Sequence, residues 1–165
     1  MGKRIEDDPE MNLCLYIVRG LSGSGKTTLA HTIASAIRGK VFEADDFFMA
    51  NGVYAFDPNS REAAHHQCKY NVNMALVGGV SCVVSNTFSC RWEFEPYIHL
   101  AEEWNARCTV LDLFDQGLTD EELAERSCHG VPISVIQRMR KGWEHDWKSC
   151  LPYRVPSFSR ANQGK

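Results

Sequence analysis

The segment "GLSGSGKT", residues 20–27, constrains this chain more than any other feature, because it fits G-x-x-x-x-G-K-[ST] at every fixed position. A short apolar run, residues 13–20, leads into it, and a helical pattern, residues 26–40, follows it. Glycines in such a loop let the backbone approach a phosphate closely, and the amide groups that open the helix face it. The segment is therefore predicted to be a phosphate-binding loop (P-loop, Walker A motif). The residues predicted to bind phosphate are Gly20, Ser22, Gly23, Ser24, Gly25, Lys26, Thr27 and Thr28.

The last two positions of the motif carry most of its chemistry. Lys26 would place a cation near the β- and γ-phosphates of a nucleoside triphosphate, and Thr27 would offer a hydroxyl to Mg²⁺. We therefore expect ATP and Mg²⁺ as cofactors. Lys26 is a predicted catalytic residue, and Thr27 is the predicted metal ligand.

Beyond the P-loop, apolar runs alternate with helical patterns along the chain. Strands are expected at residues 13–20, 40–44, 79–86 and 107–114. Helices are expected at residues 26–40, 60–76, 91–106, 119–127 and 132–147. This alternation predicts an α/β fold of the P-loop NTPase type, with a parallel sheet of four to five strands flanked by helices and a C-terminal helical lid. We assign residues 13–148 to this P-loop domain, residues 1–12 to a flexible arm and residues 149–165 to a tail.

Composition narrows the class of protein. The length of 165 residues suits one domain with its own core. A net charge of −3 argues against a broad basic surface for nucleic acid, so any such contact is expected to be local. No segment reaches the roughly 20 apolar residues of a membrane span, and the polar start "MGKRIEDDPE" does not resemble a secretory signal. Together with seven cysteines that form no C-x-x-C pair, this predicts an intracellular protein, in cytoplasm or nucleus, without a membrane partner.

Two adjacent carboxylates, Asp45 and Asp46, follow the second predicted strand directly. Ligands of open α/β sheets bind at the carboxyl ends of the strands, so both acids are expected near the mouth of the P-loop. A kinase that acts on a hydroxyl benefits from a carboxylate that accepts its proton, and we assign this role to Asp45. Asp46 is a candidate for substrate contact or for holding water on the metal. In the alternative interpretation Asp45 caps the following turn and Asp46 is solvated.

Aromatic side chains follow the two acids in a segment, residues 46–59, that is expected to be a loop. Phe47 and Phe48 are expected to be part of the core. Tyr54 and Phe56 are candidates for substrate contact, for example by stacking on a nucleobase, with burial in the core as the alternative.

The end of the third predicted strand lacks an acid. Other P-loop enzymes carry an aspartate of the magnesium shell there, whereas this chain has Ser85 and Asn86. We interpret Asn86 or Ser85 as a hydrogen-bonding partner for a metal-bound water or for the acceptor. The alternative is an ordinary turn at the end of the strand.

Residues 119–142 carry several basic side chains around the sequence "HGVP", where two short helices are expected to be joined. Such a pair can act as a lid over the P-loop. Arg126 is predicted to neutralise charge on the phosphoryl group in transfer, and His129 is a candidate for substrate contact. Arg140 and Lys141 are interpreted as a solvated basic face.

Four segments together resemble the P-loop domain of the NEDD4-binding protein 2 family and its short "like" relatives: "GLSGSGKTTLA", "FEADDFF", "SNTFSCRWEFEPYIHLA" and "EELAERSCHGVPISVIQRM". More distantly they resemble the kinase domain of phage T4 polynucleotide kinase. The resemblance implies the fold of an ATP-dependent polynucleotide 5′-hydroxyl kinase. In it, Lys26 and Thr27 match the phosphate and metal positions. Asp45 matches the proposed general base, and Arg126 matches a lid arginine at the phosphate donor.

The chain departs from the family pattern at three places. The family has N-T-N or D-T-N where this chain has Asn86, Thr87 and Phe88. The phage enzyme has an arginine for the acceptor phosphate where this chain has Phe48, and a second lid arginine around His129. The ATP side of the site therefore matches the family better than the acceptor side does.

Three functions stay open at this point. The first is a kinase for the 5′-hydroxyl of a nucleic acid, and a basic channel leading to Asp45 would favour it. The second is a small-molecule kinase of the gluconate or adenylylsulfate type, which a closed pocket would favour. The third is a non-catalytic ATP-binding module that acts through protein partners. A ring of Phe48 or Phe88 that plugs the acceptor side would favour this third function.

Overall fold

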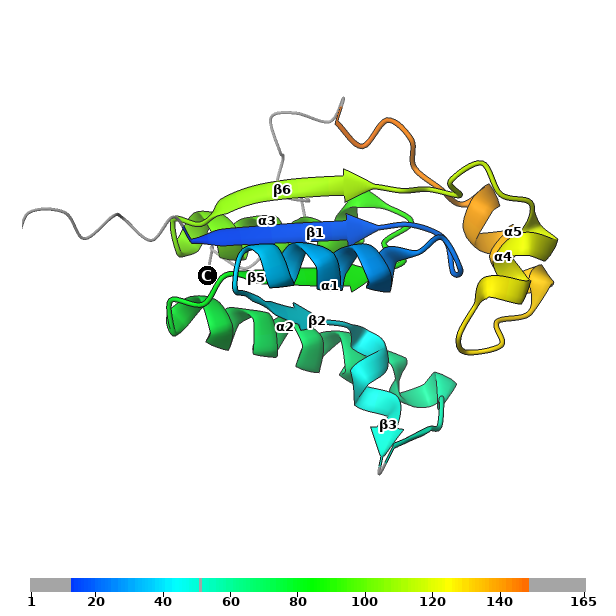
Figure 1. Cartoon of the computed structure of the whole chain (residues 1–165), viewed down its shortest axis with the longest axis horizontal. Helices are drawn as coiled ribbons and strands as arrows, with labels where there is room; N and C mark the ends of the chain where they lie inside the picture. The colour runs from blue at the N-terminus through cyan, green and yellow to red at the C-terminus, as the bar shows by residue number, and fades with distance from the viewer. Residues whose placement is uncertain (1–12, 51, 149–165) are drawn as a thin grey trace, which may run out of the picture.

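The structure, a computed structural model, describes residues 13–50 and 52–148. Four parallel strands form its main sheet in the order β2-β5-β1-β6 (Figure 1). They are β1 (Cys14–Arg19), β2 (Lys40–Phe42), β5 (Cys82–Asn86) and β6 (Arg107–Asp112). All residues of β5 are buried, because this strand lies inside the sheet and both of its faces are covered. The predicted parallel sheet is confirmed, while the predicted arm and tail lie outside the described residues.

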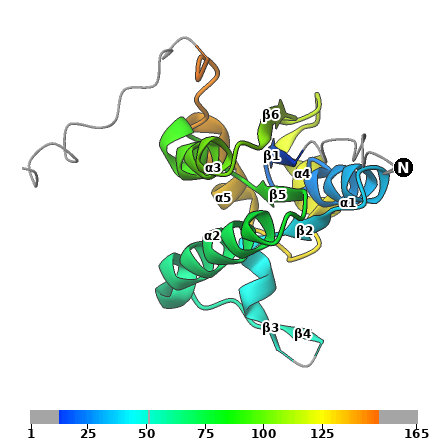
Figure 2. The ribbon, with the colours of Figure 1, turned by 90° about the vertical axis from the view of Figure 1, so that its left-hand side faces the viewer.

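Helices cover both faces of the sheet, as Figure 2 shows. On one face lies α1 (Lys26–Ala36), and on the other lie α2 (Arg61–Val77) and α3 (Arg91–Glu103). One side of α2 is buried at every fourth residue, which is the spacing of a helix face: Ala64, Cys68, Val72 and Leu76. Among the described residues, no helix is long and apolar enough to cross a membrane.

A separate helical pair, α4 (Asp120–Arg126) and α5 (Ile133–Lys141), lies beyond the carboxyl end of β1 (Figure 1). Thr119 opens α4 with the predicted capping box, in which its Oγ1 accepts a hydrogen bond from the Glu122 amide at 3.2 Å. Leu123 of α4 and Ile136 of α5 are fully buried in one cluster with Leu21 of the P-loop. The predicted lid helices therefore pack directly on the P-loop.

The segment after β2 contains more regular structure than the loop expected at residues 46–59. It forms a 3-10 helix η1 (Ala44–Phe48), an antiparallel hairpin of β3 (Met49–Ala50) and β4 (Val53–Tyr54), and a 3-10 helix η2 (Pro58–Ser60). Each strand of the hairpin has two residues, too few for an alternating pattern to be recognised in the sequence. Phe48 is buried as expected, but Phe47 is 45% exposed, so its assignment to the core was wrong.

Three helices end earlier than expected, and the third of them is α3, which ends at Glu103. The first, α1, ends at Ala36, and Arg38 then takes a left-handed φ of 52° as the chain turns towards β2. The second, α5, ends at Lys141, and Trp143 beyond it is buried in the cluster that contains Leu21. A backbone turn at Arg38 thus ends α1, whereas α5 gives way to a segment that is packed through Trp143.

Arg19, the last residue of β1, is fully buried in spite of its charge. Its guanidinium donates hydrogen bonds to the carbonyl oxygens of Phe88 at 2.9 Å, Ser89 at 2.8 Å and Glu144 at 3.1 Å. It also forms an ion pair of 3.2 Å with Asp112. One side chain thus connects the end of β1, the loop after β5 and the segment after α5, immediately before the P-loop begins.

Candidate active site

The P-loop, residues 20–27, joins β1 to α1 and depends on two glycines. Gly23 has a φ of +82°, and a Cβ there would lie 2.1 Å from the carbonyl oxygen of Leu123. At Gly20 a Cβ would lie 2.4 Å from Ser24 Oγ. The loop therefore closes tightly on itself and against α4, as the glycine-rich motif requires.

The other predicted phosphate-binding residues lie around this turn. Ser22 Oγ is 3.0 Å from the Oγ of Ser127, the first residue after α4. Ser24 is buried, and its Oγ has no partner among the residues that the structure describes. Gly25 is the N-cap residue of α1, and Thr28 is exposed in the first turn of that helix. The structure brings the predicted set together, and their contacts with phosphate stay a prediction.

The side chain of Lys26 folds back onto the P-loop backbone. Its Nζ donates a hydrogen bond to the Leu21 carbonyl oxygen at 2.9 Å. Burial lowers the pKa of Lys26 to about 8, and the negative charges of Glu43 and Asp45 oppose this shift. Two acids that follow β2 therefore lie within electrostatic reach of the P-loop lysine.

Lys26 should make the stability of the protein depend on pH between about pH 8 and about pH 10.5. In this window the unfolded chain holds a proton on Lys26 that the folded chain has released, so the free energy of unfolding rises with pH. Lys26→Met removes this contribution and leaves the other titrating groups in place. Urea unfolding of both proteins should therefore show wild type gaining stability relative to Lys26→Met as pH rises. Parallel pH curves would contradict the lowered pKa.

Thr27, the predicted metal ligand, is hydrogen-bonded to an acid that the sequence did not single out. Its Oγ1 donates to Glu43 Oε1 at 2.8 Å. Glu43 is the first acid after β2, which is the sequence signal that would have found it. Hydroxyl and carboxylate oxygens suit Mg²⁺, so these residues fit the expected cation. Residues 13–50 and 52–148 hold no group of three or more His, Cys, Asp or Glu arranged for a metal. A cation would therefore also need phosphate oxygens.

Asp45, the predicted general base, lies in η1, directly after β2, and its side chain is 49% exposed. Tyr54 Oη donates a hydrogen bond to Asp45 Oδ1 at 3.2 Å, and His129 Nε2 lies 3.7 Å from Asp45 Oδ2. Burial, with the neighbouring charge of Asp45, raises the pKa of Tyr54 to about 12, so its hydroxyl keeps the proton that it donates. The structure thus brings three of the predicted site residues together.

The rings of Tyr54 and His129 are stacked, with centroids 4.0 Å apart and an interplanar angle of 21°. Tyr54 comes from the hairpin strand β4, and His129 comes from the turn between α4 and α5. The stack therefore links the hairpin to the lid beside Asp45. Its partners are 75 residues apart in the sequence, so no local pattern predicts it.

Asp46 and Asn86, two further substrate candidates, both make contacts that shape the turn carrying Asp45. Asp46 Oδ2 accepts a hydrogen bond from the Glu43 amide at 3.1 Å. Asn86 is buried, and its Oδ1 accepts from the Ala44 amide at 2.8 Å. The capping role that the alternative interpretation gave to Asp45 thus belongs to Asp46, and Asn86 is a positioning residue in the free protein.

The rings of Phe48 and Phe88 both lie in the hydrophobic core. Phe88 is 2% exposed and packs edge-on against Tyr97 of α3, with centroids 5.4 Å apart. Phe48 packs edge-on against Phe56 at 5.0 Å. Both rings are thus held by core packing, and Phe48 also packs edge-on against Tyr54, the residue that hydrogen-bonds Asp45, with centroids 6.2 Å apart.

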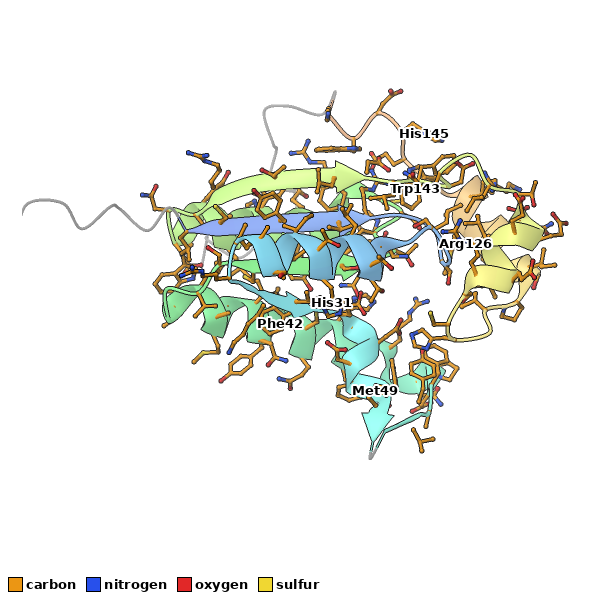
Figure 3. All side chains as sticks on the ribbon, viewed as in Figure 1. His31, Phe42, Met49, Arg126, Trp143 and His145 are labelled. Carbon is orange, nitrogen blue, oxygen red and sulfur yellow. The ribbon has the colours of Figure 1, made fainter. Side chains whose placement is uncertain are left out.

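The lid carries its basic residues in two different ways. Arg126 is exposed at the end of α4, and Figure 3 shows it between the lid helices and the P-loop. Arg140 is half-buried, and its Nε donates to Asp120 Oδ1 at 2.8 Å while its Nη1 pairs with Asp115. The interpretation of Arg140 as part of a solvated face was therefore wrong, because its guanidinium fastens α5 to the loop before α4.

Residues 15–145 match the family described as AAA domain, a span that takes in the P-loop, the acids after β2 and the lid. The chain belongs to this AAA domain family. Over 141 residues this AAA domain is 32% identical to NEDD4-binding protein 2 of Homo sapiens. The match takes in 81% of this chain and 8% of the human protein, so the chain spans only a small part of that relative.

Solved structures share the fold of this AAA domain. A chain of the Pnkp1/Rnl/Hen1 RNA repair complex superimposes with a TM-score of 0.65 and 21% identity, covering 90% of this chain and 49% of that one. A gluconokinase from Sinorhizobium meliloti 1021 gives a TM-score of 0.52 and 20% identity, covering 81% of this chain and 76% of that one. The fold is therefore that of P-loop kinases.

Proposed function

We propose that this protein is an ATP-dependent phosphotransferase that moves the γ-phosphoryl group of ATP to a hydroxyl, the 5′-hydroxyl of a nucleic acid. The observation that carries this proposal is the position of Asp45. Its carboxylate is half exposed, lies within electrostatic reach of Lys26, and has Tyr54 at one oxygen and His129 at the other. A carboxylate held beside a phosphate-binding lysine suits transfer to a hydroxyl.

In the proposed reaction Asp45 accepts the proton of the acceptor hydroxyl as its oxygen attacks the γ-phosphorus. The bond between this phosphorus and the bridging oxygen of ADP breaks, and ADP leaves with that electron pair. Lys26 and Arg126 neutralise charge that spreads over the transferring group. Mg²⁺, when bound, would neutralise charge between the β- and γ-phosphates, with Thr27 as the residue that reaches it.

Two features support a nucleic acid as the acceptor. The stacked rings of Tyr54 and His129 lie beside Asp45, and nucleobases at single-stranded ends stack on such rings. The chain also resembles the kinase domain of a polynucleotide kinase, and its fold matches a chain of an RNA repair complex. The net charge of −3 fits a short contact with one end of a strand better than a long one.

A small-molecule kinase is the second candidate, and one observation favours it. Tyr54 and His129 stack on each other and both contact Asp45, which leaves less room beside this carboxylate than an open channel would. Gluconate and adenylylsulfate represent this class of acceptor.

Transfer of labelled phosphate from ATP tests both candidates. We expect label on single-stranded DNA or RNA oligonucleotides with a 5′-hydroxyl, in the presence of Mg²⁺ or Mn²⁺. The same oligonucleotides with a 5′-phosphate have no acceptor oxygen at that end and should stay unlabelled. Lys26→Ala should transfer nothing, because it lacks the phosphate-binding cation.

The remaining outcomes decide between the candidates. Label on gluconate or adenylylsulfate alone would move the assignment to the second candidate. If ATP binds but no acceptor is labelled under any metal condition, the phosphotransferase proposal is wrong.

A further inference from the structure

Glu43 occupies a position that the reaction above does not use. It follows β2 (Lys40–Phe42) directly, and its Oε1 accepts the hydrogen bond of Thr27 Oγ1 at 2.8 Å. Thr27 lies in the first turn of α1, 16 residues earlier in the chain. The contact therefore joins the P-loop helix to the turn that carries Asp45.

The local turn explains part of the geometry of Glu43 but not this contact. Glu43 and Asp46 form a reciprocal capping pair at the start of η1, and Asn86 Oδ1 takes the next amide, that of Ala44. These contacts hold the backbone of the turn in place. The hydrogen bond from Thr27, by contrast, joins the Glu43 carboxylate to a residue outside the turn, in the P-loop.

A second observation comes from the end of β5. Ser85 lies on the same face of that strand as Val83, which packs with Ala30 of α1, so its side chain is directed to the α1 side of the sheet. Ser85 is 2% exposed, and its Oγ has no partner among the residues described. A buried hydroxyl that no side chain or backbone group satisfies is unusual and needs a partner that the protein itself does not supply.

The charges around Glu43 are arranged as a phosphate–metal site requires. Glu43 contacts Thr27, the residue that directly follows the P-loop lysine, Lys26. A threonine hydroxyl has one proton and two lone pairs. Because Thr27 gives its proton to Glu43, its lone pairs remain for a cation.

We propose that Glu43 is the carboxylate of a divalent-metal site at the P-loop. With the Thr27 hydroxyl, it would hold the Mg²⁺ that accompanies the phosphates of ATP, and Ser85 would lie beside this site. The acid that other P-loop enzymes carry after the strand equivalent to β5 is thus supplied here after β2. The inference depends on ATP binding, as the proposed function requires.

Binding of the non-hydrolysable analogue AMPPNP tests this site without catalysis. The dissociation constant is measured by calorimetry in Mg²⁺ and again in EDTA, for wild type, Glu43→Gln and Glu62→Gln. We expect Mg²⁺ to tighten AMPPNP binding to wild type. In Mg²⁺, Glu43→Gln should bind AMPPNP about 10- to 100-fold more weakly than wild type, whereas in EDTA the two proteins should bind it equally. Glu62→Gln is a matched control, because the Glu62 side chain is 90% exposed on α2, and it should behave as wild type.

Glu43→Asp tests whether the carboxylate charge at this position is what strengthens binding in Mg²⁺. It keeps the carboxylate with one methylene fewer and should retain part of the Mg²⁺ gain that Glu43→Gln loses. A Glu43→Gln protein with the full gain, or with equal losses in Mg²⁺ and in EDTA, would overturn the proposal. Wild type that binds AMPPNP in neither condition would instead overturn the proposed function.

Discussion

Asp45→Asn is expected to reduce phosphoryl transfer by a factor of about 10²–10⁴ while ATP binding stays close to that of wild type. An amide cannot accept the proton of the acceptor hydroxyl, but it keeps the shape of the side chain. Its oxygen can still accept the hydrogen bond of Tyr54, which now ends on Asp45 Oδ1 at 3.2 Å. Initial rates with a 5′-hydroxyl oligonucleotide and calorimetry with AMPPNP measure the two effects separately.

Asp46→Asn is the control for this variant, since it makes the same chemical change one residue further along. Asp46 Oδ2 accepts from the Glu43 amide at 3.1 Å, and the asparagine oxygen can do the same. Transfer should therefore fall much less than in Asp45→Asn. If Asp45→Asn is as active as wild type, or if Asp46→Asn is the more damaging change, Asp45 is not the base.

Arg19→Met is expected to lower the free energy of unfolding by about 3–5 kcal/mol. It leaves the carbonyl oxygens of Phe88, Ser89 and Glu144 without the donor that they now share. The remaining charge of Asp112 adds less, because that side chain is 27% exposed and water can solvate it. Urea unfolding followed by circular dichroism measures the loss.

Arg107→Met provides the matched comparison, because Arg107 is an exposed residue of β6, the strand that pairs with β1. Its effect should stay within about 0.5 kcal/mol. Arg19→Lys keeps the charge but cannot donate to three carbonyl oxygens in the plane of a guanidinium, so it should be intermediate. Equal stability of Arg19→Met and Arg107→Met would show that the buried contacts of Arg19 contribute little.

The sheet and the main helices could be predicted from the sequence because their signals are local. The P-loop motif follows an apolar run, and α2 repeats buried residues at every fourth position. Thr119 and Glu122 form a capping-box pattern that predicts the start of α4, and the structure confirms it. Each of these patterns lies within one element, so neighbouring residues are sufficient to recognise it.

The contacts that organise the candidate site could not be predicted in the same way. The bond between Thr27 and Glu43 and the stack of Tyr54 on His129 both join different elements. Asn86 could be read as a site residue, but its bond to the Ala44 amide depends on how β5 lies beside β2. Packing between elements decides these contacts, and a single sequence carries no record of it.

The stack of Tyr54 on His129 bears on how the free protein selects an acceptor. An acceptor that separates the two rings as it binds beside Asp45 shows the intrinsic affinity multiplied by the fraction of molecules in which the rings are apart. Stacked rings contribute about 0.5–1.5 kcal/mol, which such an acceptor must offset. An acceptor with a ring of its own can replace one stacking partner and recover this energy, whereas an acceptor without a ring cannot. The stack of Tyr54 on His129 therefore favours ring-bearing acceptors over acceptors that separate the rings without replacing either one.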